Sequence, residues 1–109
     1  MSYDLNFKSI FKKELCYFIK YKRSQGLSYK NEVYRLKKMD NILYKLKLTQ
    51  KEITKTTFDN LIKIGIDANN YNYARQYSVT KDFCKYLISC GYKKIYYEEK
   101  RFKIINNYK

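Results

Sequence analysis

Apolar residues recur along the first quarter of the chain with the spacing of an amphipathic helix. They follow the i, i+3, i+4, i+8 repeat of a helix that buries one face. We predict a helix from about Asn6 to Arg23 that ends near Gly26. Ser28 is the predicted N-cap of the next helix, because its hydroxyl can accept from a free amide of the first turn. The apolar members of the first helix are Phe7, Ile10, Phe11, Leu15, Phe18 and Ile19.

A second predicted helix, which runs to about Lys47, has two chemically different faces. At 100° per residue, its apolar face consists of Tyr29, Val33, Leu36, Met39, Leu43 and Leu46. The opposite face is basic and contains no acid: Lys30, Tyr34, Lys37, Lys38, Asn41 and Lys45. Such a face is either a solvated helix surface, since Lys is a good exposed helix former, or a surface that binds a polyanion.

Two further helices are predicted in the second half of the chain. Thr54 or Thr56 is expected to cap a short helix to roughly Ile64, which Gly65 would end; its apolar contacts are Phe58, Leu61 and Ile62. After a loop, residues 71–90 are predicted to form the last helix, with Gly91 as its C′ residue. The inner side of that helix is expected to contain Tyr73, Gln76, Tyr77, Thr80, Phe83, Cys84 and Leu87. Its outer side contains Arg75, Ser78, Lys81 and Lys85, together with Asp82.

The pattern changes after Gly91. Residues 95–97 and 102–105 are rich in β-branched and aromatic side chains, which favours an extended conformation. A strand pair, a fifth helical piece and a connection to a further domain remain open for this stretch. We predict an all-α fold of four helices over residues 1–94, followed by a short irregular or extended C-terminal tail over residues 95–109.

The charge balance points to a polyanionic partner. The chain has 24 Lys and Arg against 10 Asp and Glu, a formal net charge of +14 at pH 7. Its 45% of hydrophobic residues distinguishes it from a disordered basic tail. No stretch approaches the roughly 20 apolar residues of a membrane span, and residues 1–6 have no features of a signal peptide. We expect a cytoplasmic protein with no membrane partner.

The residue types exclude most catalytic chemistry. The chain has no His, which removes the usual general base, the commonest metal ligand and any Ser–His or Cys–His dyad. Cys16, Cys84 and Cys90 lack CxxC spacing and are expected to be reduced thiols, the first two as core residues. The carboxylates have no metal or acid–base spacing, and P-loop, GxGxxG and GxSxG motifs are missing. We expect no catalytic residue, no metal and no cofactor.

Four short motifs occur in a recognisable order. They are FIxxKRxxGLSY (residues 18–29), LKKMD (36–40), IT (53–54) and RQYSVTKDFCKYL (75–87) followed by Gly91. Together they resemble the N-terminal core-binding domain, a SAM-like four-helix orthogonal bundle, of the phage integrase or tyrosine recombinase family. Asn31 stands where that family often has Thr, and the Pro that often follows its last helix is missing here.

The resemblance implies one half of a C-shaped clamp around duplex DNA at a recombination site, with the second and fourth helices crossing the major groove. Strand cleavage in that family belongs to a separate C-terminal domain, so this chain would be a non-catalytic fragment, remnant or regulator. Its partners would be a catalytic domain in the same parent chain and other recombinase protomers on the DNA.

This interpretation assigns DNA contacts to two sets of residues. Lys and Arg would neutralise phosphates, and the Asn and Ser side chains would contact base edges or sugars. The predicted contacts are Lys30, Asn31, Tyr34, Lys37, Lys38, Asn41 and Lys45 on the second helix, and Asn72, Arg75, Ser78, Lys81 and Lys85 on the fourth. Two rival interpretations are a helical protein-interaction module and a single-stranded nucleic-acid binder that stacks bases on its tyrosines.

Overall fold

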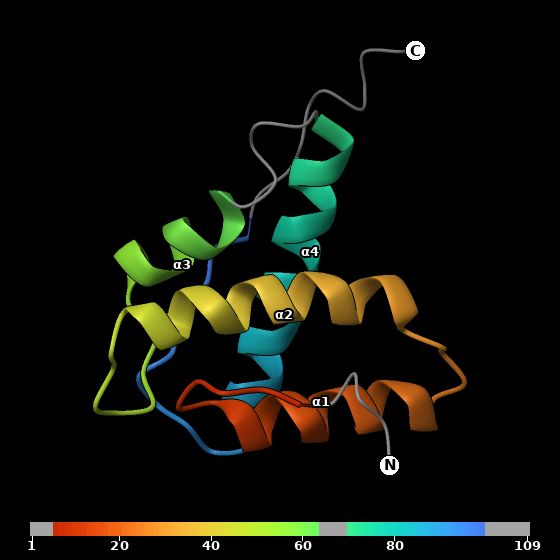
Figure 1. Ribbon diagram of the computed structural model, residues 1–109, viewed down its shortest axis with the longest axis horizontal. Helices are drawn as coiled ribbons and strands as arrows, with labels where there is room; N and C mark the ends of the chain where they lie inside the picture. Colours follow the sequence, from red (N-terminus) through yellow and green to blue (C-terminus); the bar gives the residue numbers. More distant parts are fainter. Residues whose placement is uncertain (1–5, 64–69, 100–109) are drawn as a thin grey trace.

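The computed structural model describes residues 6–63 and 70–99, without the side chains of residues 70–72. Those residues form four helices: α1 (Lys12–Ser24), α2 (Lys30–Lys45), α3 (Lys55–Ile62) and α4 (Asn70–Ser89). Figure 1 shows α1 and α2 running in opposite directions, with α3 near the C-terminal end of α2 and α4 crossing behind α2. The prediction of an all-α fold is confirmed.

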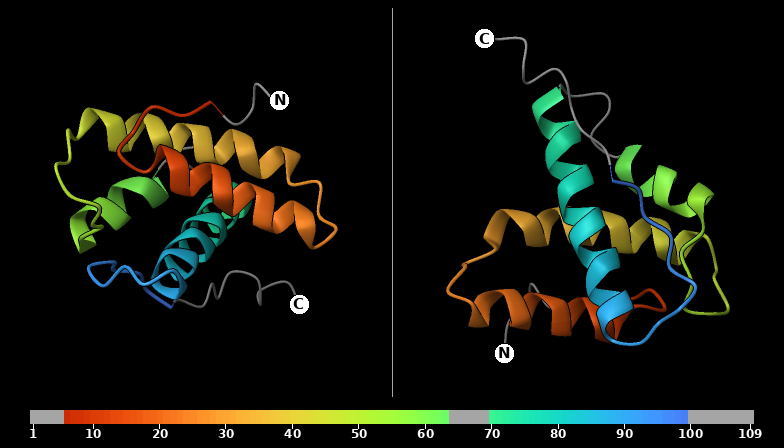
Figure 2. Two further views of the ribbon diagram at one scale, coloured as in Figure 1. Left: turned by 90° about the horizontal axis from the view of Figure 1, so that it is seen from below. Right: turned by 180° about the vertical axis from the view of Figure 1, so that it is seen from behind.

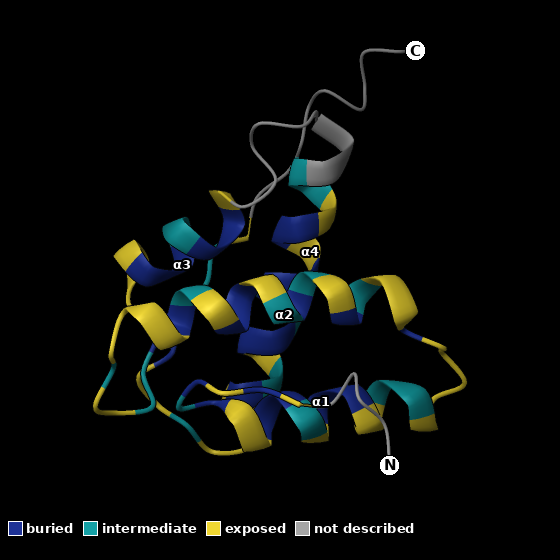
Figure 3. Ribbon diagram, viewed as in Figure 1, coloured by how far each residue is buried: buried dark blue, intermediate teal, exposed yellow. Residues whose placement is uncertain are grey.

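The core lies where the four helices meet, and their exposed residues face outward (Figure 3). Phe83 of α4 is fully buried, and its ring centroid lies 6.1 Å from that of Phe11 and 5.3 Å from that of Phe18, both edge-on. The predicted inner side of α4 is confirmed for Gln76, Tyr77, Thr80, Phe83, Cys84 and Leu87, which are all buried, while Tyr73 is half-buried. α4 is therefore the element around which the core is built.

The predicted start of the first helix is wrong, because α1 begins at Lys12 rather than near Asn6. The Asp40 carboxylate of α2 accepts hydrogen bonds from the backbone N–H groups of Lys8 (2.9 Å) and Ser9 (2.8 Å). The Ser9 hydroxyl in turn accepts from the Phe11 N–H. These bonds hold residues 6–11 as a non-helical segment along α2, which we call the N-terminal segment.

The predicted N-cap of the second helix is also wrong. Tyr29, not Ser28, occupies the N-cap position of α2, with φ 57° and no side-chain capping bond. The Tyr29 ring is buried edge-on against Phe18, with centroids 5.8 Å apart, so packing overrides the capping preference of Ser28. The Ser28 carbonyl instead accepts from Arg23 Nε at 2.9 Å.

The two predicted faces of α2 are confirmed apart from one residue. Val33, Leu36, Met39 and Leu43 are buried. Leu46 is 40% exposed, contrary to prediction, because α2 ends at Lys45 and Leu46 is its C-cap.

The ends of α3 and α4 follow the sequence signals. The Thr54 hydroxyl accepts from the Thr57 N–H, which confirms it as the N-cap of α3; Gly65, predicted to end that helix, lies outside the described residues. Gly91 has φ 105°, and the Gly91 and Tyr92 N–H groups donate to the carbonyls of Ile88 and Leu87. This is the Schellman pattern expected of a C′ glycine.

The described part of the C-terminal stretch is extended and packs on α3. Ile95 forms an isolated parallel bridge with Ile53: the Ile53 N–H donates to the Lys94 carbonyl (2.9 Å) and the Tyr96 N–H to the Ile53 carbonyl (2.8 Å). Ile95 is buried, and the Tyr96 ring lies edge-on to Phe58. Residues 100–109, including the second apolar run, lie outside the described residues.

Candidate nucleic-acid interface

One side of α2 is an exposed polar surface over the full length of the helix. Sixteen residues at 1.5 Å each give a length of about 24 Å. The exposed predicted contact residues define what we call the α2 face: Lys30, Asn31, Tyr34, Lys38, Asn41 and Lys45. The Tyr34 side chain is 64% exposed, and Lys38 Nζ lies 4.6 Å from the centroid of its ring. This cation–π contact keeps an amine and an aromatic ring together on the surface.

Lys37 lies at one edge of the α2 face. It is half-buried, and its Nζ sits 5.9 Å from the ring centroid of Phe7 in the N-terminal segment. The amine therefore has both a structural contact and access to solvent, unlike the fully exposed lysines of the face.

The predicted contacts on α4 have different environments. Ser78 and Lys85 are exposed. Arg75 is exposed and pairs with Glu32 of α2, with 3.8 Å between Nη2 and Oε2. Lys81 is half-buried and donates to the Glu99 carboxylate at 3.3 Å; burial lowers its pKa, but this hydrogen bond leaves the pKa raised. The side chain of Asn72 lies outside the described residues.

The structure does not place all of these residues on one surface. α2 and α4 touch where the Thr80 hydroxyl donates to Met39 Sδ at 3.6 Å. At 100° per residue, Ser78 and Lys85 point away from that contact, as does the α2 face. α4 lies behind α2 in Figure 1 and in front of it in the right-hand view of Figure 2. Ser78 and Lys85 therefore lie on the side of α4 that faces away from α2. Arg75 lies on the same side by this count, but its longer side chain reaches Glu32 of α2.

The acidic residues are used elsewhere in the described part of the chain. Five ion pairs join elements: Lys22 with Asp82, Lys51 with Glu14, Arg75 with Glu32, Lys55 with Glu98, and Lys81 with Glu99. A sixth pair, between Lys55 and Asp59, lies within α3. Asp40 is buried and binds two backbone amides. The positive charge of the α2 face is thus uncompensated by acids on the same face.

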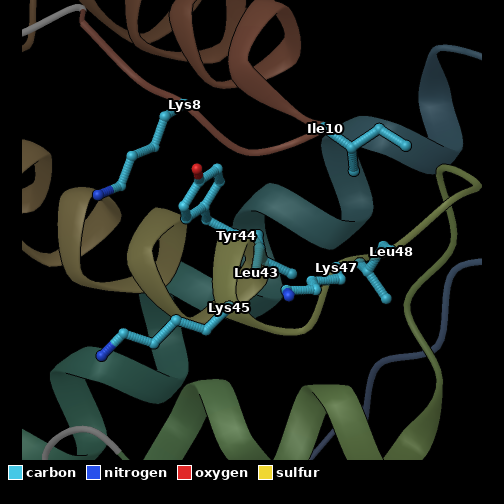
Figure 4. Close-up of a pocket in the computed structure, with 7 residues that line it drawn as sticks. All are labelled: Lys8, Ile10, Leu43, Tyr44, Lys45, Lys47 and Leu48. Atoms are coloured by element: carbon cyan, nitrogen blue, oxygen red, sulfur yellow. The ribbon is translucent and has the colours of Figure 1, made fainter.

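Three residues beside the α2 face were not predicted as site residues. Lys8, Tyr44 and Lys47 line a pocket of about 450 Å3 at the C-terminal end of α2, together with Lys45 (Figure 4). The helical wheel did not identify Lys8, because Lys8 belongs to the N-terminal segment rather than to a helix. The helical wheel did not identify Lys47, because α2 ends at Lys45.

The shifted pKa values have structural causes. Burial raises the pKa of the Cys84 thiol to about 12, which makes it a poor nucleophile, and burial also raises the pKa of Tyr29. Burial opposes ionisation of Glu14, but hydrogen bonds from Tyr92 and Lys51 leave its pKa lowered. Glu14 joins α1 to the loop before α3 and to the segment after α4, a stabilising position.

Among the residues that the structure describes, no cluster of His, Cys, Asp and Glu has the arrangement of a metal site. No helix in the same ranges has the length and apolar character needed to cross a bilayer.

Comparison of the chain with protein-family models, curated proteins and solved structures gives no significant match.

Proposed function

We propose that this chain is a non-catalytic duplex DNA-binding domain, the SAM-like core-binding domain of a site-specific tyrosine recombinase, and that the α2 face contacts the duplex. The observation that carries the proposal is the α2 face itself: an exposed, acid-free helix surface with Lys30, Lys38 and Lys45 along its length. The order and spacing of the four sequence motifs support the recombinase assignment.

The dimensions and chemistry of the α2 face suit a major groove. A groove about 12 Å wide accepts one α-helix. Lysine amines supply phosphate contacts, which give affinity without sequence preference. Asn31 and Asn41 lie among these lysines, and an Asn amide can pair with adenine through two hydrogen bonds. The α2 face thus combines the groups that position a protein on DNA with groups that can distinguish bases.

The proposal assigns the first contacts to α2 and Arg75. A straight duplex laid on the α2 face does not reach Ser78 and Lys85, because they point to the other side of the molecule. A clamp that also used those two residues would need DNA, or a second protein domain, on that side.

Salt dependence of duplex binding tests the proposal quantitatively. If the duplex contacts the five cations that the proposal assigns to it, Lys30, Lys37, Lys38, Lys45 and Arg75, log affinity should fall against log salt with a slope of about −4.5. The double variant Lys30→Glu/Lys38→Glu should reduce the slope to about −2.7, because two phosphate contacts are lost. Fluorescence anisotropy with a labelled 20-base-pair duplex between 50 and 200 mM salt measures both slopes.

The matched control carries the same charge change elsewhere. Lys20 on α1 and Lys85 on α4 are exposed, so Lys20→Glu/Lys85→Glu also lowers the net charge by four but leaves the α2 face intact. Its slope should remain near that of the wild type. Equal losses in the two double variants would show that net charge, and not the α2 face, drives binding. Tighter binding to the matching single strand would favour a base-stacking protein instead.

A further inference from the structure

The pocket at the C-terminal end of α2 combines positive charge with apolar surface. Lys8 and Ile10 come from the N-terminal segment, Tyr44 and Lys45 from α2, and Lys47 and Leu48 from the loop that follows. Figure 4 shows the Tyr44 ring beside Lys8, the amines of Lys8 and Lys45 on one side of the view, and the amine of Lys47 on the other side, near Leu43 and Leu48. The volume of about 450 Å3 lies within the range of small-molecule sites.

The lining divides into groups that suit two parts of one ligand. The described lining residues include three lysines and no acid, which favours an anion. Tyr44 is 53% exposed, with Lys8 Nζ 4.9 Å from its ring centroid, and Ile10 and Leu48 add aliphatic surface. A bare inorganic anion would leave this aromatic and aliphatic surface unused. A ligand with a flat, weakly polar ring and a phosphate would use both parts.

The backbone at Lys47 gives a second, independent indication. Lys47 has φ 53°, a left-handed conformation that is unfavourable for a residue with a Cβ and free of strain for Gly. A Gly at this helix end would satisfy the backbone better. Tyr29 has the same left-handed conformation, but its ring is buried in the core, whereas Lys47 is exposed and lines the pocket, so core packing does not account for its strain.

We propose that this pocket binds a nucleoside phosphate, with the base against Tyr44 and the aliphatic surface, and the phosphate held by Lys8, Lys45 and Lys47. The pocket shares only Lys45 with the α2 face, and the inference does not depend on duplex binding. The nucleoside phosphate is either a free nucleotide or the unpaired, 5′-phosphorylated end of a nucleic-acid strand.

NMR titration of the labelled full chain with thymidine 5′-monophosphate, thymidine and inorganic phosphate tests the two-part recognition. The nucleotide should shift the amide signals of Ile10, Tyr44 and Leu48 and bind at least about tenfold more tightly than either part alone, since it engages both surfaces. Equal binding of inorganic phosphate, or no shift at these residues, would overturn the proposal.

The variant Lys47→Gly separates binding from folding. It removes a pocket amine and relieves the left-handed strain, so nucleotide affinity should fall about tenfold, as for one lost charge-assisted hydrogen bond, while the thermal midpoint rises. Tyr44→Leu should also weaken nucleotide binding but leave phosphate binding unchanged. Lys20→Ala, outside the pocket, is the control and should change neither. Unaltered nucleotide binding by Lys47→Gly would refute the assignment of the phosphate.

Two further titrations distinguish the sources of the ligand. A duplex with one unpaired, 5′-phosphorylated nucleotide should bind more tightly than a blunt duplex if the pocket takes a strand end, and Lys47→Gly should abolish that difference. If the wild type shows no such difference but binds thymidine 5′-monophosphate, the source is a free nucleotide. Lys30→Glu/Lys38→Glu should leave mononucleotide binding unchanged, so failure of the duplex proposal and failure of the pocket proposal are separate results.

Discussion

Replacement of Asp40 by Ala should strongly destabilise the fold, because one carboxylate holds the N-terminal segment on α2. Its oxygens accept from the Lys8 and Ser9 N–H groups at 2.9 and 2.8 Å, and the side chain is buried. A hydrogen bond to a charged group contributes about 1.5 to 3 kcal/mol, so loss of two should reduce the free energy of unfolding by at least about 3 kcal/mol. For a domain of this size, the thermal midpoint should fall by at least about 12 °C.

Urea denaturation followed by circular dichroism measures this loss directly. Asp40→Asn should cost about half as much, because an amide oxygen accepts from one N–H while its NH₂ group cannot accept from the other. Asp59→Ala is the matched control: that carboxylate is more exposed and pairs with Lys55 at 3.5 Å within one helix, and solvent screens such an exposed pair, so its loss should change the stability little. A loss below about 1 kcal/mol for Asp40→Ala would refute the reasoning, because other contacts would then hold the segment.

Two further substitutions test the contacts of α1 and α3. The pKa of Glu14 is lowered in the fold, so its carboxylate stabilises the fold at pH values above the ordinary carboxyl pKa of 4.5, and this stability is lost as the pH falls through the lower folded-state pKa. Glu14→Gln should therefore reduce the loss of stability in acid, measured by urea denaturation between pH 7 and 3. A loss of stability equal to that of the wild type would contradict this prediction. Thr54→Ala should reduce the free energy of unfolding by about 1 kcal/mol through loss of the N-cap bond to Thr57, whereas Thr56→Ala, an exposed residue in the first turn of the same helix, should change it by less than half of that value in the same denaturation assay.

The helices were predictable because apolar spacing and packing agree along most of the chain. The two faces of α2 and the inner side of α4 follow from the 3.6-residue repeat alone, and Thr54 and Gly91 act through local backbone bonds. The start of α1 was not predictable, because it depends on Asp40, 32 residues from Lys8. Local patterns contain no information about such a distant acceptor.

The candidate site was only partly predictable for the same reason. A helical wheel identifies the exposed side of α2, but it does not show how α4 is oriented against α2. That orientation became known only from the structure, through the contact between Met39 and Thr80. It shows that Ser78 and Lys85 lie on the side of α4 away from α2. The pocket contains residues that a helical wheel does not include, because Lys8 precedes α1 and Lys47 follows the end of α2.

The described acids and the lysines of the α2 face have different places in the structure. Most described acids join one element to another: Glu32 connects α2 to Arg75 of α4, Asp82 connects α4 to Lys22 of α1, and Glu98 connects the C-terminal stretch to α3. The lysines Lys30, Lys38 and Lys45 join no elements in the described ranges. This distribution is consistent with the proposal of an anionic partner for the α2 face, and a partner that neutralised the whole length of α2 would itself be extended.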